Sequence, residues 1–211
     1  KYEILIIVNY FGFIEDNNII TNIKKLRPDI IIISDNVQSF WTFDKSKANF
    51  SFTSLRKHFP VPGGALIYSK DEFLEVEEHS NEINFSILKL IGSIMKYCDI
   101  PDKFYLKYYE EGEKVLEKES SISKANLFSQ YLYEKIDFEN AKKKRKENCK
   151  LVYQIGQGFG LNFLFPFNDN VVPLNVPILI KKRDHIKRKL KESNVFLPVH
   201  WPLSDFNMQS K

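Results

Sequence analysis

Three short motifs between residues 35 and 64 carry side chains whose chemistries complement one another. The first offers a carboxylate and an amide in Asp35 and Gln38, and the second offers a hydroxyl and an amine in Ser54 and Lys57. The third is the glycine pair at 63–64, which would let the backbone turn tightly. Each motif alone is weak evidence, because a lone Asp after a strand is usually a turn or capping residue. Together they bring an acid, an amine and hydrogen-bonding groups to one stretch of the chain.

This set matches what a pyridoxal 5'-phosphate cofactor requires of a protein. The cofactor needs a lysine amine for its aldehyde carbon, a carboxylate that keeps its ring nitrogen protonated, a partner for its ring hydroxyl and donors for its phosphate. We assign Lys57 and Asp35 to the first two roles, as the catalytic residues. Gln38 would lie near the ring hydroxyl, and Ser54 would contribute to the phosphate site, with Ser51 as the second choice. Apolar neighbours after Lys57 predict a partly buried amine.

An α/β fold with a mainly parallel sheet is expected to position these motifs. Residues Glu3 to Tyr10 form an apolar, β-branched run that is typical of a strand buried on both faces. Asn18 to Leu26 has apolar residues at helical spacing, and a second strand follows at Asp29 to Ser34. We therefore expect two adjacent parallel strands joined by a helix. Open α/β sheets place ligand-contacting groups at the carboxyl ends of their strands, which is where Asp35 falls.

The rest of the chain is predicted to change from this rhythm to helices and then to a small mixed unit. We expect three parts: a partial large cofactor-binding domain at 1–83, a helical connector at 84–135 and a small α+β C-terminal domain at 136–211. The glycines at 156, 158 and 160 are predicted to end a helix rather than to bind a nucleotide, because they follow a helix. The predicted elements are strands at Phe50–Thr53, Ala65–Ser69 and Val195–His200, an extended segment at Val171–Ile180, and helices from Asp71, within Asn84–Glu119 with a break at Pro101, within Ser123–Gln154 and at Arg183–Glu192.

The order of these motifs resembles that of the DegT/DnrJ/StrS-type sugar aminotransferases, which have the fold of aspartate aminotransferase (fold type I). That family carries an aromatic-Gly motif after one strand, an Asp-x-x-Gln motif, a serine-rich turn with the lysine, and paired glycines. Later in the chain, residues 144–148 look like the family's Arg-x-x-Asn signature, and 194–202 look like its late strand. The resemblance places His200 and Trp201 near the substrate.

The resemblance implies a pyridoxal-phosphate-dependent aminotransferase. Its substrates would be an amino donor such as glutamate and a keto sugar nucleotide of glycan or polysaccharide biosynthesis, and it would work as a homodimer whose subunits share each cofactor site. In such enzymes the glycine-rich phosphate cup and the aromatic residue that stacks on the pyridine ring precede the part that matches Lys1 onward. We therefore expect the chain to be a fragment, and the fragment alone to be inactive.

Two alternatives stay open at this point. The first is a dehydratase or lyase of the same fold, because some relatives have histidine where the lysine stands and His58 follows Lys57 directly. The second is a truncated, non-catalytic remnant that persists as a binding or scaffolding piece. The serine spacing also departs from the family pattern, since the usual serine lies five residues before the lysine.

Composition excludes several other classes of function. The 211 residues carry 31 basic and 27 acidic side chains, and the basic runs at 142–146 and 181–183 are predicted to be solvated helix faces without a nucleic-acid motif. Cys98 and Cys149 lack metal-ligand spacing and fit a reduced compartment, so we expect a cytoplasmic protein without a metal. The apolar runs are far shorter than the ~20 residues of a membrane helix.

Overall fold

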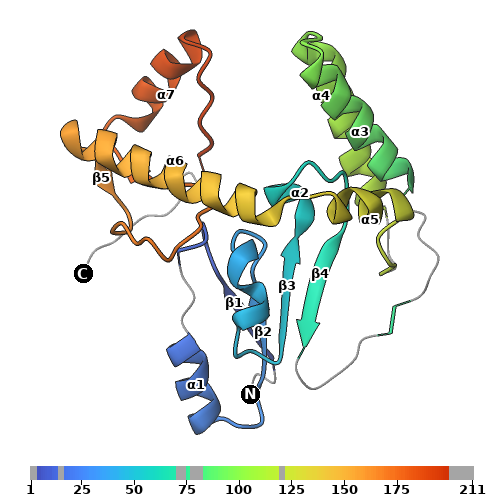
Figure 1. Cartoon of the computed structure of the whole chain (residues 1–211), viewed down its shortest axis with the longest axis vertical. Coiled ribbons are helices and arrows are strands. Elements are labelled where there is room, and N and C mark those ends of the chain that lie inside the picture. The colour runs from blue at the N-terminus through green and yellow to red at the C-terminus, as the bar shows by residue number, and fades with distance from the viewer. Residues whose placement is uncertain (1–3, 14–16, 70–74, 77–82, 119–121, 200–211) are drawn as a thin grey trace.

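A four-stranded sheet forms the centre of the computed structural model, which describes residues 4–13, 17–69, 75–76, 83–118 and 122–199. The strand order is β1 (Ile4–Val8), β2 (Ile31–Asp35), β3 (Phe50–Ser54) and β4 (Ala65–Ser69) (Figure 1). The first three strands are parallel, and β4 runs antiparallel to β3. The predicted adjacency of the first two strands is confirmed, and α1 (Asn17–Leu26) joins them. The fold is therefore mixed α/β with a mainly parallel sheet.

The two faces of this sheet differ in burial. On one face Ile32 and Ser34 are fully buried, and Ile20 of α1 packs with Ile32. The 3-10 helix η1 (Phe40–Lys45) follows β2. On the other face the side chains of Ile4 and Ile6 are 53% and 61% exposed. The prediction that the first strand is buried on both faces is thus wrong, because no described helix covers the second face.

A core cluster anchors the turn that follows β3. It consists of Phe40, Leu55, Phe59 and Val61, all buried, and includes residues at both ends of α2 (Leu55–His58). Phe138, in the first turn of α6 (Phe138–Gly158), packs on this cluster with its ring stacked 5.9 Å from that of Phe40. The long helix α6 thereby lies across the carboxyl ends of the parallel strands (Figure 1).

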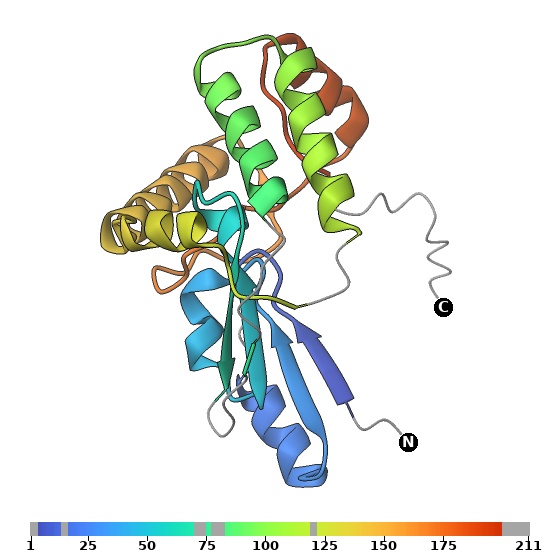
Figure 2. The same cartoon turned by 90° about the vertical axis from the view of Figure 1, so that its right-hand side faces the viewer.

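A helical hairpin stands beyond the same end of the sheet. It is made of α3 (Ile83–Tyr97) and α4 (Asp102–Leu116), and Pro101 precedes α4 as its N-cap, so the predicted break is confirmed (Figure 2). The following helix, α5 (Leu127–Glu134), is tied to α3 because Asn126 donates to the hydroxyl of Ser86 at 2.7 Å. The helix predicted to begin at Asp71 lies outside the described residues.

The C-terminal part combines α6 with β5 (Asn162–Phe163), β6 (Ile178–Leu179) and α7 (Arg183–Glu192). The two short strands pair antiparallel. As predicted, α6 ends at the glycines, and Gly156 is required by packing because a Cβ there would lie 2.4 Å from the ring of Phe163. The predicted strand at 195–200 is not observed over 195–199, and His200 is outside the described residues.

This C-terminal part packs back onto the sheet. The backbone N–H of Leu174 donates to the carbonyl oxygen of Phe11 at 2.9 Å, and the rings of Phe13 and Phe165 stack at 4.9 Å. Residues from the predicted first and third domains therefore contact each other directly. None of the helices in the described part of the chain is long and apolar enough to span a membrane.

Candidate functional site

Asp35 is the last residue of β2 and lies at the carboxyl edge of the parallel strands. It pairs with Val8 of β1 and Phe52 of β3 and is half-buried. One carboxylate oxygen, Oδ1, accepts the backbone N–H of Val37 at 2.9 Å, which orients the side chain. The other oxygen, Oδ2, makes no hydrogen bond with a described residue, so it can accept a proton-bearing group of a ligand.

A buried polar network supports this edge from the opposite face of the sheet. Asn9 donates to the hydroxyl of Ser34 at 2.9 Å and to the side-chain oxygen of Asn36 at 2.7 Å. The hydroxyl of Thr53 donates to the carbonyl oxygen of Asn36 at 2.8 Å. The network joins three neighbouring strands, and sequence analysis missed it. The available signal was an asparagine shortly after each of two apolar runs, Asn9 directly after the first and Asn36 three residues after the second.

Gln38 connects the loop after β2 to the turn after β1. Its side-chain oxygen accepts the backbone N–H of Phe11 at 3.0 Å. A side chain held in this way stays beside the edge that carries Asp35. This contact is compatible with the predicted role near a ring hydroxyl, because the amide nitrogen of Gln38 is still available as a donor.

The two candidate serines lie on opposite faces of the sheet. Ser51 is 2% exposed and donates its hydroxyl hydrogen to the carbonyl oxygen of Phe43. Ser54 lies two residues after Phe52, the partner of Asp35, and therefore shares a face with Asp35. It is partly exposed and makes no capping hydrogen bond to α2. The geometry favours Ser54 as a phosphate donor and counts against Ser51.

Lys57 lies on α2, directly after β3, and its side chain is exposed. The prediction of a partly buried amine is wrong, because the apolar neighbours Phe59 and Val61 turn into the core cluster instead. The turn that returns the chain to β4 depends on Gly64, whose φ of +100° is a conformation that side chains disfavour. Residues 62–63 form a bend before Gly64, and that the glycine pair turns the chain beside a cofactor stays a prediction.

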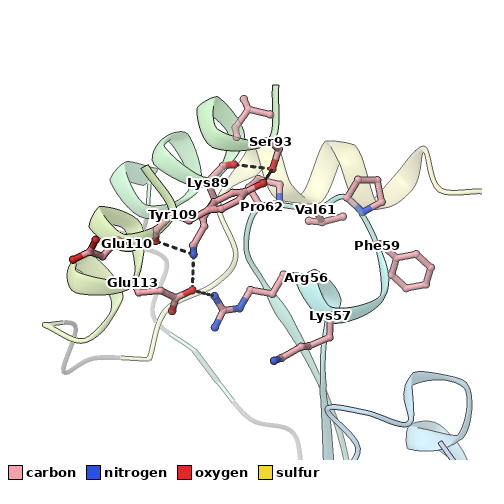
Figure 3. Close-up of a pocket in the computed structure, with 12 residues that line it drawn as sticks. Arg56, Lys57, Phe59, Val61, Pro62, Lys89, Ser93, Tyr109, Glu110 and Glu113 are labelled. Carbon is pink, nitrogen blue, oxygen red and sulfur yellow. Dashed lines mark hydrogen bonds and ion pairs between the residues drawn. The ribbon is translucent and has the colours of Figure 1, made fainter. Parts of the chain in front are cut away.

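Lys57 is one of the residues that line a surface pocket of about 630 Å³ between α2 and the α3–α4 hairpin (Figure 3). Within it Arg56 lies 2.9 Å from a carboxylate oxygen of Glu113, and Lys89 forms an ion pair with the same oxygen. Partial burial alone would raise the pKa of Glu113. The hydrogen bond from Lys89 and the positive charge of Arg56 together have the larger effect, so the pKa of Glu113 is lowered. Lys57 makes no ion pair with a described residue, so its amine is the unneutralised cation of the pocket lining.

His58, the next residue, points the other way and is 7% exposed. Its Nε2 lies 3.1 Å from the carbonyl oxygen of Val37, to which it donates, and its ring centroid lies 5.5 Å from that of Phe40. Burial lowers the pKa of His58 to about 4, with the charges of Arg145 and Lys57 lowering it further and the bond to Val37 opposing the shift. His58 is therefore neutral at physiological pH.

The structure thus brings some of the predicted residues to one place and leaves others apart. Asp35, Ser54 and Lys57 share one edge of the sheet, but Asp35, Gln38 and Ser54 do not line the Lys57 pocket. That Asp35 and Lys57 face one cleft stays a prediction. His200 and Trp201 lie outside the described residues.

The described residues fit part of a pyridoxal 5'-phosphate molecule. The Lys57 amine and Oδ2 of Asp35, neither of which pairs with a described residue, match its aldehyde and its ring nitrogen, and the Ser54 hydroxyl matches one contact of its phosphate. One basic run of the chain also differs from its sequence-based interpretation. In the run at 142–146, predicted to be a solvated helix face, Arg145 is half-buried and donates to the carbonyl oxygen of His58 at 3.0 Å.

Comparisons with protein-family models and with curated proteins give no match to this chain. Among solved structures it is similar to the phosphoserine aminotransferase SerC from Cytophaga hutchinsonii, with 15% sequence identity and a TM-score of 0.43. The similarity covers 92% of this chain and 54% of the other, so this chain spans about half the length of that enzyme. A likeness this distant carries no argument about activity.

Proposed function

We propose that this chain carries the cofactor-anchoring part of a pyridoxal-phosphate-dependent aminotransferase, with Lys57 and Asp35 as its catalytic residues. One observation carries the proposal. Because β2 and β3 are parallel neighbours, the carboxylate that ends β2 and the amine that follows β3 arrive at the same edge of the sheet. The cofactor needs these two groups at opposite ends of its ring.

The two residues would divide the chemistry between them. Bound pyridoxal phosphate supplies an electron sink for the substrate's α-carbon. Lys57 anchors the cofactor and then moves a proton from that carbon, a role open to an amine that no carboxylate of the pocket neutralises. Oδ2 of Asp35 accepts the hydrogen of the ring nitrogen, while the N–H of Val37 holds the other carboxylate oxygen in place. Ser54 contributes a donor to the phosphate.

The finer features of the proposal come from the resemblance to the DegT/DnrJ/StrS-type enzymes. They are glutamate as amino donor, a keto sugar nucleotide as acceptor, a role in glycan or polysaccharide biosynthesis, a homodimer and a cytoplasmic location. His200 and Trp201 remain the proposed substrate contacts.

The burial of His58 argues against the dehydratase alternative. Its ring packs against Phe40 and donates to Val37, so it does not reach the pocket that Lys57 lines. The non-catalytic alternative is favoured by a different observation, the exposure of Lys57, since catalytic amines work in sites that exclude water. The experiment below separates these possibilities.

Borohydride reduction in the presence of limiting pyridoxal phosphate tests the proposal, with peptide mass mapping as the readout. The label should concentrate on Lys57 and disappear in Lys57→Ala, whereas the control Lys45→Ala, at an exposed lysine of η1, should label like the parent chain. Asp35→Asn should keep the label on Lys57. It should lose most transamination in the active protein, because a neutral amide does not stabilise the positive charge of the protonated ring nitrogen. Equal labelling of many lysines would support the non-catalytic alternative.

A further inference from the structure

A second pocket, of about 670 Å³, lies on the His58 side of α2. Its walls come from residues 58–61, the end of α5 and the first turns of α6. The lining has an apolar part and a polar, mostly charged part. The apolar part is Phe59, Val61, Leu132, Ile136 and Ala141, and the polar part includes Lys135, Lys144, Arg145 and Asn148.

Arg145 is the most informative residue of this pocket, because it is half-buried without a counter-charge. One of its terminal nitrogens donates to the carbonyl oxygen of His58 at 3.0 Å, and none of the described carboxylates pairs with it. Burial lowers the pKa of its guanidinium, which reports a charge partly removed from water. Arg56, on the other side of α2, pairs with Glu113. A partly desolvated guanidinium that has no ion-pair partner lowers the stability of the fold unless an anion binds to it.

The neighbours of Arg145 add positive charge and donors. Lys144 and Asn148 lie on the same side of α6 because they are separated by four residues, and both are exposed. The acidic residue of the lining, Asp137, is already engaged, since its side chain accepts the backbone N–H of Asn140 at 3.0 Å and caps α6. The polar part of the pocket is thus prepared for an acceptor-rich, negatively charged group.

We propose that this pocket binds a small organic oxyanion on the side of α2 opposite the Lys57 pocket, with which it shares Phe59, Pro60 and Val61 in its lining. A phosphate or carboxylate group lies against Arg145 and Lys144, whose donors suit either group, and Arg145 can hold it by two parallel hydrogen bonds. The apolar part of the ligand covers Leu132 and Ile136, which are partly exposed. The site does not depend on the aminotransferase proposal, because none of its residues takes part in that chemistry.

Titration with matched aromatic ligands tests the site, in the absence of pyridoxal phosphate and at constant ionic strength. The probes are phenyl phosphate, benzoate, inorganic phosphate and the neutral benzyl alcohol, followed by NMR signals of α6 amides and of the His58 ring. At least one aromatic anion should bind saturably and several-fold more tightly than inorganic phosphate, because the apolar floor adds buried area. The preferred anion identifies the ligand class. Benzyl alcohol binding as tightly as both aromatic anions would overturn the proposal.

The His58 ring provides a readout that surface adsorption would not move. The charge of Arg145 helps to lower the pKa of His58, so an anion that offsets this charge should raise that pKa. Binding should fall at least tenfold in Arg145→Gln and several-fold in Lys144→Gln, whose exposed side chain is dispensable for folding. Arg183→Gln, on α7 and paired with Asp184, is the control and should bind normally. Unchanged affinity in Lys144→Gln, or an equal loss in Arg183→Gln, would refute the site.

Discussion

The two sides of α2 differ in burial and charge, although the side chains that mark them, Lys57 and His58, are consecutive in the chain. On the Lys57 side the amine is exposed, and the neighbouring cations Arg56 and Lys89 share Glu113 as their ion-pair partner. On the His58 side the imidazole is buried and neutral, and Arg145 has no counter-ion among the described carboxylates. Consecutive residues of this four-residue helix therefore differ sharply, one with an exposed amine and the next with a buried imidazole.

This difference shows that adjacent residues of suitable chemistry are not interchangeable candidates. The sequence favours Lys57 over His58 for the site, because the Ser-x-x-Lys spacing matches Lys57. In the structure the rings of Phe40 and Phe59 lie against the ring of His58, whereas Lys57 is exposed. The three predictions that follow probe this contrast, beginning with the largest effect.

The first prediction compares truncations of the two residues. His58→Ala should lower the free energy of unfolding by about 3 to 4 kcal/mol, because it leaves a cavity among aromatic rings and an unpaired Val37 carbonyl. Lys57→Ala should change it by less than about 0.5 kcal/mol, as is usual for an exposed side chain. Urea denaturation followed by circular dichroism measures both. Equal losses would show that the contrast between the two sides is absent in solution.

The second prediction concerns pH. The pKa of His58 is about 4 in the folded chain against an ordinary value of 6.5, so the unfolded chain takes up the proton first as the pH falls. The contribution of His58 to the free energy of unfolding should be fully present above pH 6.5 and should be lost, by about 3 kcal/mol, as the pH falls from 6.5 to 4. In His58→Gln this part of the decline should vanish, whereas His185→Gln, at an exposed position of α7, should keep it. The measurement is the urea midpoint at each pH.

The third prediction removes the neutralising group of the Lys57 pocket. Glu113→Gln leaves Arg56 and Lys89 without their shared counter-ion and should cost at most about 1 kcal/mol, since solvent screens this half-exposed carboxylate. The loss should shrink in high salt. Glu110→Gln, which removes the exposed i,i+4 pair with Lys114, is the matched control and should cost less. A larger loss in Glu110→Gln would contradict the bridging role of Glu113.

Much of the fold was predictable because its helices and strands follow from local sequence patterns. The β-branched runs, the helical spacing before Pro28 and the break at Pro101 each depend on neighbouring residues, and each is confirmed. The burial of β1 was not predictable, since it depends on which distant segments cover the sheet. The strand expected at Val195–His200 is not observed over 195–199 for the same reason, because a strand requires a partner that local sequence does not specify.

The site was predicted less completely than the fold. Strand order explains why Asp35 and Lys57 reach one edge, and the sequence contained that information. The face on which each serine lies, the ion pairs of Glu113 and the half-buried state of Arg145 depend on contacts between segments up to 87 residues apart. Charge runs in particular conceal such residues, because one member of the run can turn inward while the others remain solvated.

The hydrogen-bonded asparagines at the strand ends have a mechanical consequence for the edge that bears Asp35. Strand ends usually fray, because their last backbone groups can exchange one partner for water at little cost. Here the release of one strand end would leave the polar atoms of Asn9, Ser34 and Asn36 without partners inside a dry layer. The ends of β1, β2 and β3 can therefore loosen only together, so the backbone that carries the carboxylate of Asp35 is held in place by all three strands.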